Sequence, residues 1–259
     1  MTAKYHPSRE ISHIVEQQMR QWEIARAQRI KSEQLLRLAE SNINIDYITI
    51  SRPLGSGGEI IAGELAAMLQ WQLYDHEILD FMAEDMNVHK SLLQSVDEHT
   101  ISWIGEWLDP FFTRKTGIEQ LSYYRHLIHV LMIIAKHGQA IIVGRAAGLV
   151  LPRQNGLSVR VTASLEQRVK NYARENDISE TEAFSIVEKS DRTQKSFVRS
   201  FVNQDVTDAK HYDITINTAK FTPHSAAKLI WRCLDQRRIS QPPAPKDSKS
   251  ILTLLNRNL

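Results

Sequence analysis

The sequence contains a single cysteine, Cys233, among its 259 residues. One thiol excludes an internal disulfide framework and a zinc site built from several cysteines. We interpret Cys233 as a small buried apolar residue of a C-terminal helix. Long apolar runs are also missing. The longest, residues 131–135 and 146–151, are far shorter than the roughly 20 residues that span a bilayer.

An excess of charge of one sign is absent too. The chain has 32 lysines and arginines against 30 acidic residues, a net charge of +2. This balance gives no reason to expect a nucleic-acid binder, although local anion sites are compatible with it. The N-terminus is polar and charged, without the apolar core of a signal peptide. We therefore expect a cytoplasmic protein that binds neither nucleic acid nor a membrane.

Residues 8–40 are predicted to form one long helix with a narrow apolar stripe. The stripe recurs at three- and four-residue spacing and consists of Ile11, Ile14, Val15, Met19 and Trp22. It must pack on something. One interpretation is docking on the core of the same chain; the other is a contact in a homodimer or with another partner. A membrane-surface helix is disfavoured, because acidic residues are mixed with the basic ones.

Strands and helices alternate along the rest of the chain. The expected strands are 47–51, 73–74, 140–143, 158–162 and 213–217, and the expected helices are 59–70, 80–96, 118–137, 164–176, 179–202 and 223–236. This order predicts a parallel sheet with right-handed crossovers. We divide the chain into a helical extension (1–45), an α/β domain (46–239) and a flexible tail (240–259), which is rich in proline and polar residues.

A glycine-rich turn, Gly55-Ser56-Gly57-Gly58, directly follows the first expected strand and precedes a helix. Glycine permits positive φ and a close approach of the backbone to a ligand. Successive amide groups before a helix N-terminus form an anion cradle, and a nucleotide phosphate is its usual occupant. The alternative is a tight turn that binds nothing.

This turn departs from the P-loop motif G-x-x-x-x-G-K-[ST]. Aligned on Gly57, the chain has Arg52 for the first glycine, Gly58 for the lysine and Glu59 for the serine or threonine. The lysine normally neutralises phosphate charge during transfer. A carboxylate at Glu59 would repel phosphate unless it turned away or held a metal ion. Arg52, or an arginine from a lid, is the candidate for a replacement cation.

The run from Ile48 to Gly58, I-T-I-S-R-P-L-G-S-G-G, followed by Ile61-Ala62 and Leu73-Tyr74-Asp75, resembles the cytidylate-kinase-like family. That family typically reads I-T-I-S-R-x-x-G-S-G-G-R-E-I-A, with F-Y-D one helix later. The missing lysine is thus shared with the family, whereas Glu59 replaces its usual arginine. The resemblance implies a three-layer P-loop kinase fold: a parallel sheet flanked by helices, a helical lid and, here, an N-terminal helical extension like that of some bacterial relatives.

Further matches lie downstream. Residues 141–152, I-I-V-G-R-A-A-G-L-V-L-P, are similar to the family segment G-R-D-I-G-x-V-x-x-P, although Ala146 replaces its aspartate. The resemblance implies that Arg145 binds the phosphate of the acceptor monophosphate. Residues 159–168 resemble the segment that leads into the lid. The candidate lid cations are Arg168, Arg192, Lys195 and Arg199.

The residues themselves leave alternatives for these roles. Arg145 follows a buried strand at the edge where ligands bind in open α/β sheets, and a guanidinium can bind phosphate through two bonds; a surface salt bridge is the alternative. Asp75 either contacts the acceptor or caps a helix. The helix face with Arg192, Lys195 and Arg199 either closes on phosphates or is a solvated charged face.

Two further clusters have less specific interpretations. His126 and His129 are three residues apart on an expected helix, and we interpret them as packing or surface residues, so no metal site is expected. The aromatic residues Trp103, Trp107, Phe111 and Phe112 are interpreted as core packing or as a cap over the acceptor site, in preference to nucleic-acid stacking.

The resemblance implies a nucleoside-monophosphate kinase-like phosphotransferase that moves the γ-phosphoryl group of ATP to CMP or a related nucleotide, with Mg²⁺. Gly55, Ser56, Gly57 and Gly58 would cradle the donor phosphates. The alternatives are a nucleotide-binding regulatory protein without turnover, which Gly58, Glu59 and Ala146 favour, and a scaffold that acts through its N-terminal helix.

Overall fold

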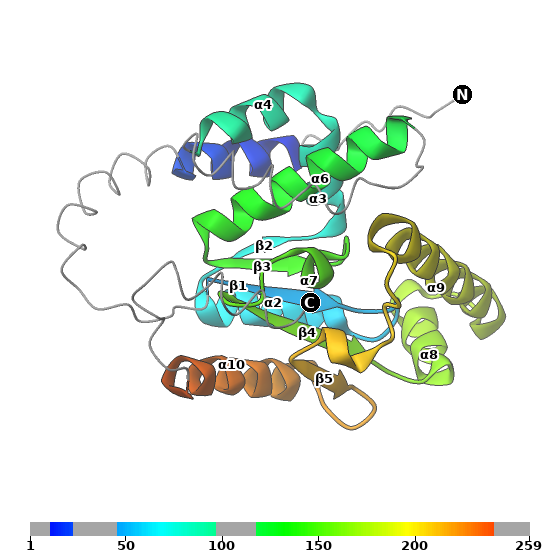
Figure 1. Ribbon diagram of the computed structural model, residues 1–259. Helices are drawn as coiled ribbons and strands as arrows, with labels where there is room; N and C mark the ends of the chain where they lie inside the picture. The colour runs from blue at the N-terminus through cyan, green and yellow to red at the C-terminus, as the bar shows by residue number, and fades with distance from the viewer. Residues whose placement is uncertain (1–10, 23–45, 97–117, 241–259) are drawn as a thin grey trace, which may run out of the picture.

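The computed structural model describes residues 11–22, 46–96 and 118–240. A five-stranded parallel sheet forms the centre of the described part, in the order β2-β3-β1-β4-β5 (Figure 1). Its strands are β1 (Tyr47–Ser51), β2 (Gln72–Tyr74), β3 (Ala140–Val143), β4 (Gly156–Thr162) and β5 (Ile214–Asn217). All four residues of β3 are buried, as a central parallel strand covered on both faces requires. The predicted parallel sheet is confirmed.

Helices cover both faces of this sheet. They are a helix over residues 11–22, α2 (Gly58–Leu69), α3 (His76–Glu84), α4 (Met86–Gln94), α6 (Ile118–His137), α7 (Ala147–Val150), α8 (Leu165–Asn176), α9 (Glu180–Val202) and α10 (Pro223–Ser240), with a short 3-10 helix, η2 (Ala209–His211). α2 and α10 pack on one face of the sheet, and α3, α4 and α6 pack on the other (Figure 1). The pair α8 and α9 projects from one end of the sheet as the helical lid.

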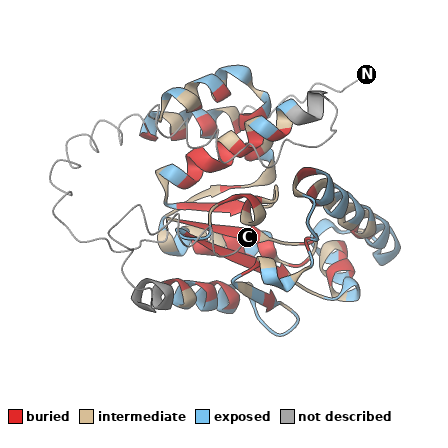
Figure 2. Ribbon diagram, in the orientation of Figure 1, coloured by how far each residue is buried: buried red, intermediate tan, exposed pale blue. Residues whose placement is uncertain are grey.

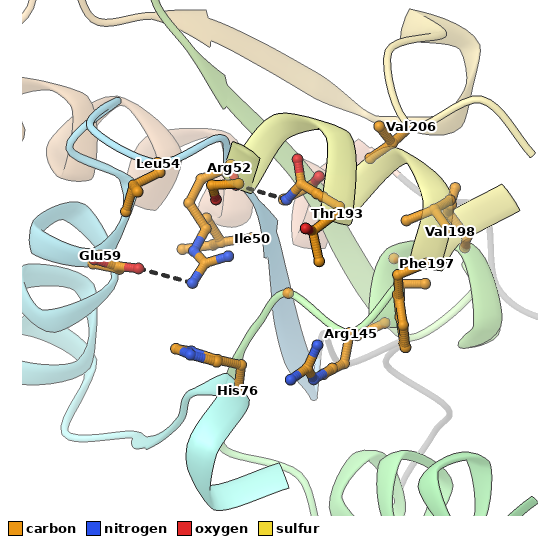
Figure 3. A pocket seen from close by; sticks show the side chains of 18 of the residues that line it. Ile50, Arg52, Leu54, Glu59, His76, Arg145, Thr193, Phe197, Val198 and Val206 are labelled. Atoms are coloured by element: carbon orange, nitrogen blue, oxygen red, sulfur yellow. Dashed lines mark hydrogen bonds and ion pairs between the residues drawn. The ribbon is translucent and has the colours of Figure 1, made fainter. Parts of the chain in front are cut away.

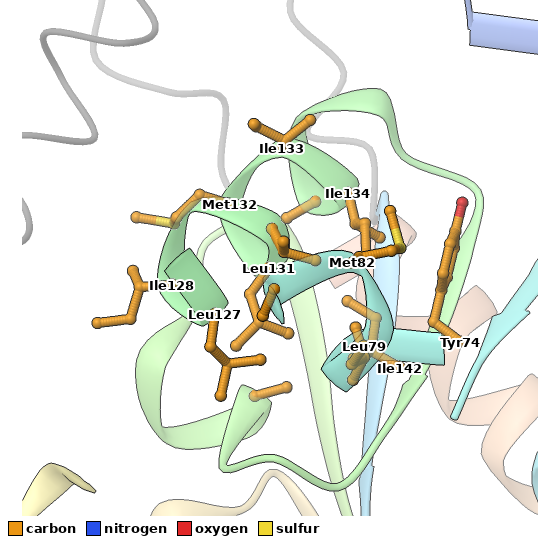
Figure 4. Close-up of a cluster of buried hydrophobic side chains, with 14 of the residues drawn as sticks. Tyr74, Leu79, Met82, Leu127, Ile128, Leu131, Met132, Ile133, Ile134 and Ile142 are labelled. Carbon is orange, nitrogen blue, oxygen red and sulfur yellow. The ribbon is translucent and has the colours of Figure 1, made fainter. Parts of the chain in front are cut away.

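Side-chain alternation along the strands builds a separate core on each face. Ile48 and Ile50 pack with residues of α2 and α10 on one face. On the other, Leu79 and Met82 of α3 meet Leu127 and Leu131 of α6 (Figure 4). The buried residues follow the sheet and the inner faces of its helices (Figure 2). Each fully buried leucine or isoleucine stabilises the fold by about 1.5–3 kcal/mol.

The helix over residues 11–22 docks on the core of its own chain. Ile11, Val15 and Trp22 are buried in the same cluster as α3 and α6. The Trp22 ring stacks on His137 with the ring centroids 4.3 Å apart. One of the two sequence interpretations, docking on the chain's own core, therefore holds for this part of the predicted helix. Ile14, also assigned to the stripe, is 36% exposed.

Two sequence expectations need correction. The single helix predicted over 80–96 is two helices, because Asp85 ends α3 and its carboxylate accepts hydrogen bonds from the amides of Asn87 and Val88 at the start of α4. Cys233 is half-buried in α10, whereas a buried position was expected. No helix among residues 11–22, 46–96 and 118–240 is long and apolar enough to cross a membrane.

Several predictions fall outside the described residues. They concern the predicted helix at 8–10 and 23–40, the aromatic residues Trp103, Trp107, Phe111 and Phe112, and the tail 241–259. The proposed division of the chain at residues 45 and 240 stays a prediction.

Candidate active site

A cavity of about 450 Å³ opens at the carboxyl ends of β1 and β3. After β1 the chain crosses to β2 on one side, and after β3 it crosses to β4 on the other. Ligands of open α/β sheets bind at such a switch point. The cavity is lined by the end of β1, the β3–α7 loop, the first residue of α3 and one face of α9 (Figure 3).

The glycine turn has the backbone geometry of an anion cradle. Gly55 and Gly57 have φ values of 75° and 76°, in the left-handed region that favours glycine. Gly57 is the N-cap of α2, and Gly58 is the first residue of that helix. The Ser56 hydroxyl is buried and donates to the carbonyl of Pro53 at 2.7 Å, so it holds the turn together.

Arg52 fills the space that a side chain at position 58 would need. A Cβ atom built on Gly58 would lie 2.5 Å from Cβ and 2.8 Å from Cγ of Arg52. A Cβ on Gly144 would lie 3.3 Å from Nη1 of Arg52. The two glycines therefore leave room for the stem and the guanidinium of Arg52, which lines the cavity.

Glu59 is turned toward Arg52. Nη2 of Arg52 donates to Oε1 of Glu59 at 2.8 Å, while Nε of Arg52 is buried and has no partner among the described residues (Figure 3). The Glu59 side chain is 57% exposed and that of Arg52 only 14%. Glu59 can therefore leave the ion pair and turn to water at a small cost in free energy, because its side chain is largely solvated already.

The described residues do not form a resident magnesium site. Glu59 is the only carboxylate among the lining residues of the cavity that the structure describes, and it is paired with Arg52. Within the same part of the chain, no three His, Cys, Asp or Glu side chains gather to hold a metal ion. A Mg²⁺ ion would have to be held mainly by the phosphates of a nucleotide, as is common for this ion.

Arg145 lines the cavity from the β3–α7 loop and is oriented by Asp80 of α3. Its Nε donates to Oδ1 of Asp80 at 2.6 Å, and its Nη2 donates to Oδ2. Tyr123 donates to the same carboxylate at 2.7 Å, and the Phe197 ring lies 5.2 Å from the guanidinium carbon. Burial opposes the charge of Arg145, but its bonds to Asp80 raise its pKa, so it stays cationic. Among the described residues, Asp80 binds Nε and Nη2 and leaves Nη1 for a ligand.

Asp75, expected at the acceptor site or at a helix cap, caps α3. Its carboxylate accepts from the amide of Ile78 at 2.9 Å. The next residue, His76, lines the cavity instead, and its Nδ1 is buried without a partner among the described residues. Sequence reasoning missed His76; its place two residues after the end of β2 was the available signal.

The expected lid cations lie outside the cavity lining. Arg168 is buried and binds Asp191 through two bonds of 2.9 and 2.7 Å. Arg192 is exposed and pairs with Glu188 at 3.2 Å. Lys195 and Arg199 are exposed as well.

The face of α9 that lines the cavity is offset from these cations. It carries Ile186, Lys189, Ser190, Thr193, Gln194, Phe197 and Val198. A shift of one residue turns a helical side chain by about 100°, which explains why Arg192 and Lys195 miss a cavity that Lys189 and Thr193 line. Sequence reasoning missed this face because it mixes polar and apolar residues and has one lysine.

His126 and His129 pack with His89 between α4 and α6, away from the cavity. Nε2 of His89 and Nδ1 of His129 are 3.2 Å apart, and the ring centroids of His89 and His126 are 4.1 Å apart. Burial lowers the pKa of both His89 and His129 to about 4. This geometry agrees with the interpretation of these residues as packing histidines.

Comparison with known proteins identifies a family whose members resemble this chain in sequence. Residues 47–220 match the model of the cytidylate kinase-like family. Cytidylate kinase of Ignicoccus hospitalis is 26% identical over 188 residues, covering 72% of this chain and 98% of that protein. Cytidylate kinase of Sulfolobus acidocaldarius is 23% identical over 193 residues, covering 74% and 96%.

A solved structure of an uncharacterised protein from Eubacterium ventriosum has the same fold. It superposes with a TM-score of 0.58 at 22% identity and covers 74% of this chain and 99% of its own. The fold is thus shown by the structure and the family by the sequence match, which spans the glycine turn at 55–58, Arg145 and the lid. The chain belongs to the cytidylate kinase-like family.

Proposed function

We propose that the protein is a phosphotransferase that moves the γ-phosphoryl group of ATP to CMP or a related nucleoside monophosphate. Family membership supports a nucleoside-monophosphate kinase-like function. One observation carries the proposal of turnover. The stem of Arg52 occupies the space beside Gly58, the position of the P-loop lysine, and thereby brings a cation to residues 52–58, which we call the phosphate loop.

Phosphoryl transfer asks the protein to align two phosphates and to neutralise charge between them. In our proposal the backbone amides of Gly55, Gly57 and Gly58 hold the donor phosphates at the N-terminus of α2, while the Ser56 amide donates to the carbonyl of Pro53 and closes the turn. When a nucleotide binds, the guanidinium of Arg52 leaves Glu59 and pairs with the phosphate, which carries more charge than a carboxylate. Glu59 then turns to water.

Arg145 is proposed to hold the acceptor phosphate. Asp80 fixes its guanidinium and leaves Nη1 for that contact. Such pre-orientation lowers the entropy lost when the phosphate binds. We propose His76 as a further contact of the acceptor, because it lines the same cavity.

Lys189 is our candidate for the lid cation that contacts a bound phosphate, since it lines the cavity. Arg168 is proposed to organise the lid through Asp191. The phosphate contacts expected of Arg192, Lys195 and Arg199 stay predictions and would require α9 to rotate on closure. An acceptor contact by Asp75 likewise stays a prediction.

A second candidate function is a nucleotide-binding regulatory protein without turnover. The observation that favours it is the ion pair between Glu59 and Arg52, which holds a carboxylate at the phosphate loop. Ala146 stands where the family has an aspartate, so the carboxylate of that aspartate is absent from the site. In this function the ion pair would set the threshold for nucleotide binding.

Calorimetric titration with ATP and with CMP, each with and without Mg²⁺, followed by a coupled ADP-release assay, separates the two functions. Saturable binding of both nucleotides with CMP-dependent ADP release is the expected result. Binding without release would favour the regulatory function. Release that persists in an Arg52→Met variant would contradict the role of Arg52. The same assay with AMP and UMP as acceptors tests the base preference.

A further inference from the structure

Side chains of both lid helices donate hydrogen bonds to backbone carbonyls of the phosphate loop. Nε2 of Gln194 in α9 donates to the carbonyl of Arg52 at 2.8 Å. Nδ2 of Asn171 in α8 donates to the carbonyl of Gly55 at 2.9 Å. Nη1 of Arg168 donates more weakly, at 3.3 Å, to the carbonyl of Leu54 between them. Three carbonyls in a stretch of four residues therefore point to the lid.

Packing joins the same two elements. The lid has a small apolar core of its own, made of Val169, Ala173, Ala183 and Val187, and the side chain of Leu54 packs against it. At Gly55 the backbone of the loop lies close to that of α8, because a Cβ atom there would lie 2.3 Å from the carbonyl oxygen of Arg168. A side chain at position 55 would push α8 off the loop.

The two lid helices are also bound to each other beside this contact. Arg168 of α8 and Asp191 of α9 form a two-point ion pair, and the Arg168 side chain is only 7% exposed. Movement of one helix away from the loop would break this pair or carry the other helix along. The loop, α8 and α9 are therefore connected as one unit.

We propose that Asn171 and Gln194 are positioning residues that set the phosphate-binding geometry of residues 52–58. A loop binds phosphate through its amides only if its carbonyls point elsewhere, since a carbonyl oxygen repels an anion. The two amide side chains hold those carbonyls toward the lid, so lid docking and phosphate binding favour each other. The proposal rests on the proposed function in that the bound phosphate is that of a nucleotide.

Two variants of unchanged shape test the proposal. Asn171→Asp and Gln194→Glu each replace a donor by an acceptor that faces a carbonyl oxygen. Asn176→Asp is the matched control for Asn171→Asp, because Asn176 lies on the exposed end of α8 and donates to the carbonyl of Tyr172 within its own helix. It adds the same charge to the same helix. Asn171→Ala, which adds no charge, repeats the test if the carboxylate variants unfold.

Hydrogen exchange of the amides of Arg52 and residues 54–58 in the nucleotide-free protein is the first measurement, and calorimetric titration with ADP is the second. We expect faster exchange confined to the loop and ADP binding weaker by about fivefold in each variant, roughly the value of one hydrogen bond. Asn176→Asp should match the wild type in both. Unchanged loop exchange in both variants, or faster exchange throughout the sheet, would overturn the proposal. If wild-type protein failed to bind ADP, the proposed function would fail, while the exchange data would still decide the positioning role.

Discussion

Arg145 and Asp80 are 65 residues apart in the sequence and form a two-point ion pair at the wall of the cavity, with Nε of Arg145 2.6 Å from Oδ1 of Asp80. The side chains are 25% and 18% exposed, and Tyr123 donates to the same carboxylate. An arginine held in this way has one defined orientation toward a ligand. The pair therefore links the packing of α3 to the proposed acceptor site.

An Asp80→Asn change removes the charge that orients Arg145. We expect the affinity for the acceptor monophosphate to fall by about tenfold and the free energy of unfolding by about 1–3 kcal/mol, between the values for surface and buried pairs. Calorimetry and urea unfolding measure the two effects. Asp208→Asn is the control, because Asp208 pairs with Lys210 at the exposed surface. Equal effects of the two changes would contradict a special role for Asp80.

Gly58→Ala tests whether Arg52 needs the space beside position 58. The added Cβ would collide with the stem of Arg52, so the guanidinium must move. We expect ATP affinity to fall by about tenfold or more and stability to fall by about 1–3 kcal/mol from overpacking.

The control for this change is Gly63→Ala in the same helix, where an added Cβ meets nothing within 4 Å. Alanine is favoured over glycine in a helix by up to about 1 kcal/mol, so this variant should be slightly more stable and bind ATP normally. Normal ATP binding by Gly58→Ala would sink the assigned role of Arg52.

A Glu59→Gln change releases Arg52 from its ion pair. We expect ATP to bind about three- to tenfold more tightly, because the phosphate no longer competes with a carboxylate. Glu59→Arg, which restores the residue usual in the family, should have at least the same effect. Glu64→Gln is the matched control on α2, since Glu64 pairs with His224. Unchanged ATP affinity in both Glu59 variants would show that the pair does not limit binding.

Acid should destabilise the packing of α4 on α6. Burial, together with the charges of the neighbouring histidines and Arg125, lowers the pKa of His89 and His129 from 6.5 to about 4. The unfolded chain therefore binds protons below pH 6.5 that the folded chain does not bind until about pH 4. Stability is fully present above pH 6.5 and falls as the pH drops toward 4, by about 1–2 kcal/mol after solvent screening.

Urea unfolding at pH 7.5 and 4.5 measures this loss. His89→Gln should reduce the difference between the two pH values, whereas His13→Gln, at an exposed position of the first helix, should leave it unchanged. An identical pH difference in all three proteins would refute the assignment to the histidine cluster.

Val15→Asp places a charge in the interface between the first helix and the core. Val15 is 1% exposed, so we expect a loss of at least about 3 kcal/mol from burial of an unpaired charge and the lost apolar contacts. Thermal unfolding measures it, and His13→Gln serves as the control.

Deletion of residues 1–40 with measurement of the mass in solution tests the homodimer. A Val15→Asp variant that unfolds like the wild type but changes its mass would favour the partner interpretation.

The sequence by itself determined the strands, the glycine turn and the alternation of strands and helices, because these depend on local periodicity and on backbone conformations that few residues adopt. Apolar runs such as 140–143 and the turn at 55–58 carry that signal within a few residues. The departures from the P-loop motif at Gly58 and Glu59 were also visible in the sequence, but the contacts of both residues with Arg52 were not.

Only the tertiary structure decided which side chains meet. Asp80 and Arg145, or Gln194 and the carbonyl of Arg52, are joined across 65 and 142 residues, and no local pattern encodes such pairs. In the structure, Arg192, Lys195 and Arg199 lie outside the lining of the cavity, whereas His76 and Lys189 line it. Charge identifies candidate phosphate ligands, but their direction depends on helix phase and docking, which are set by the packing of the whole domain.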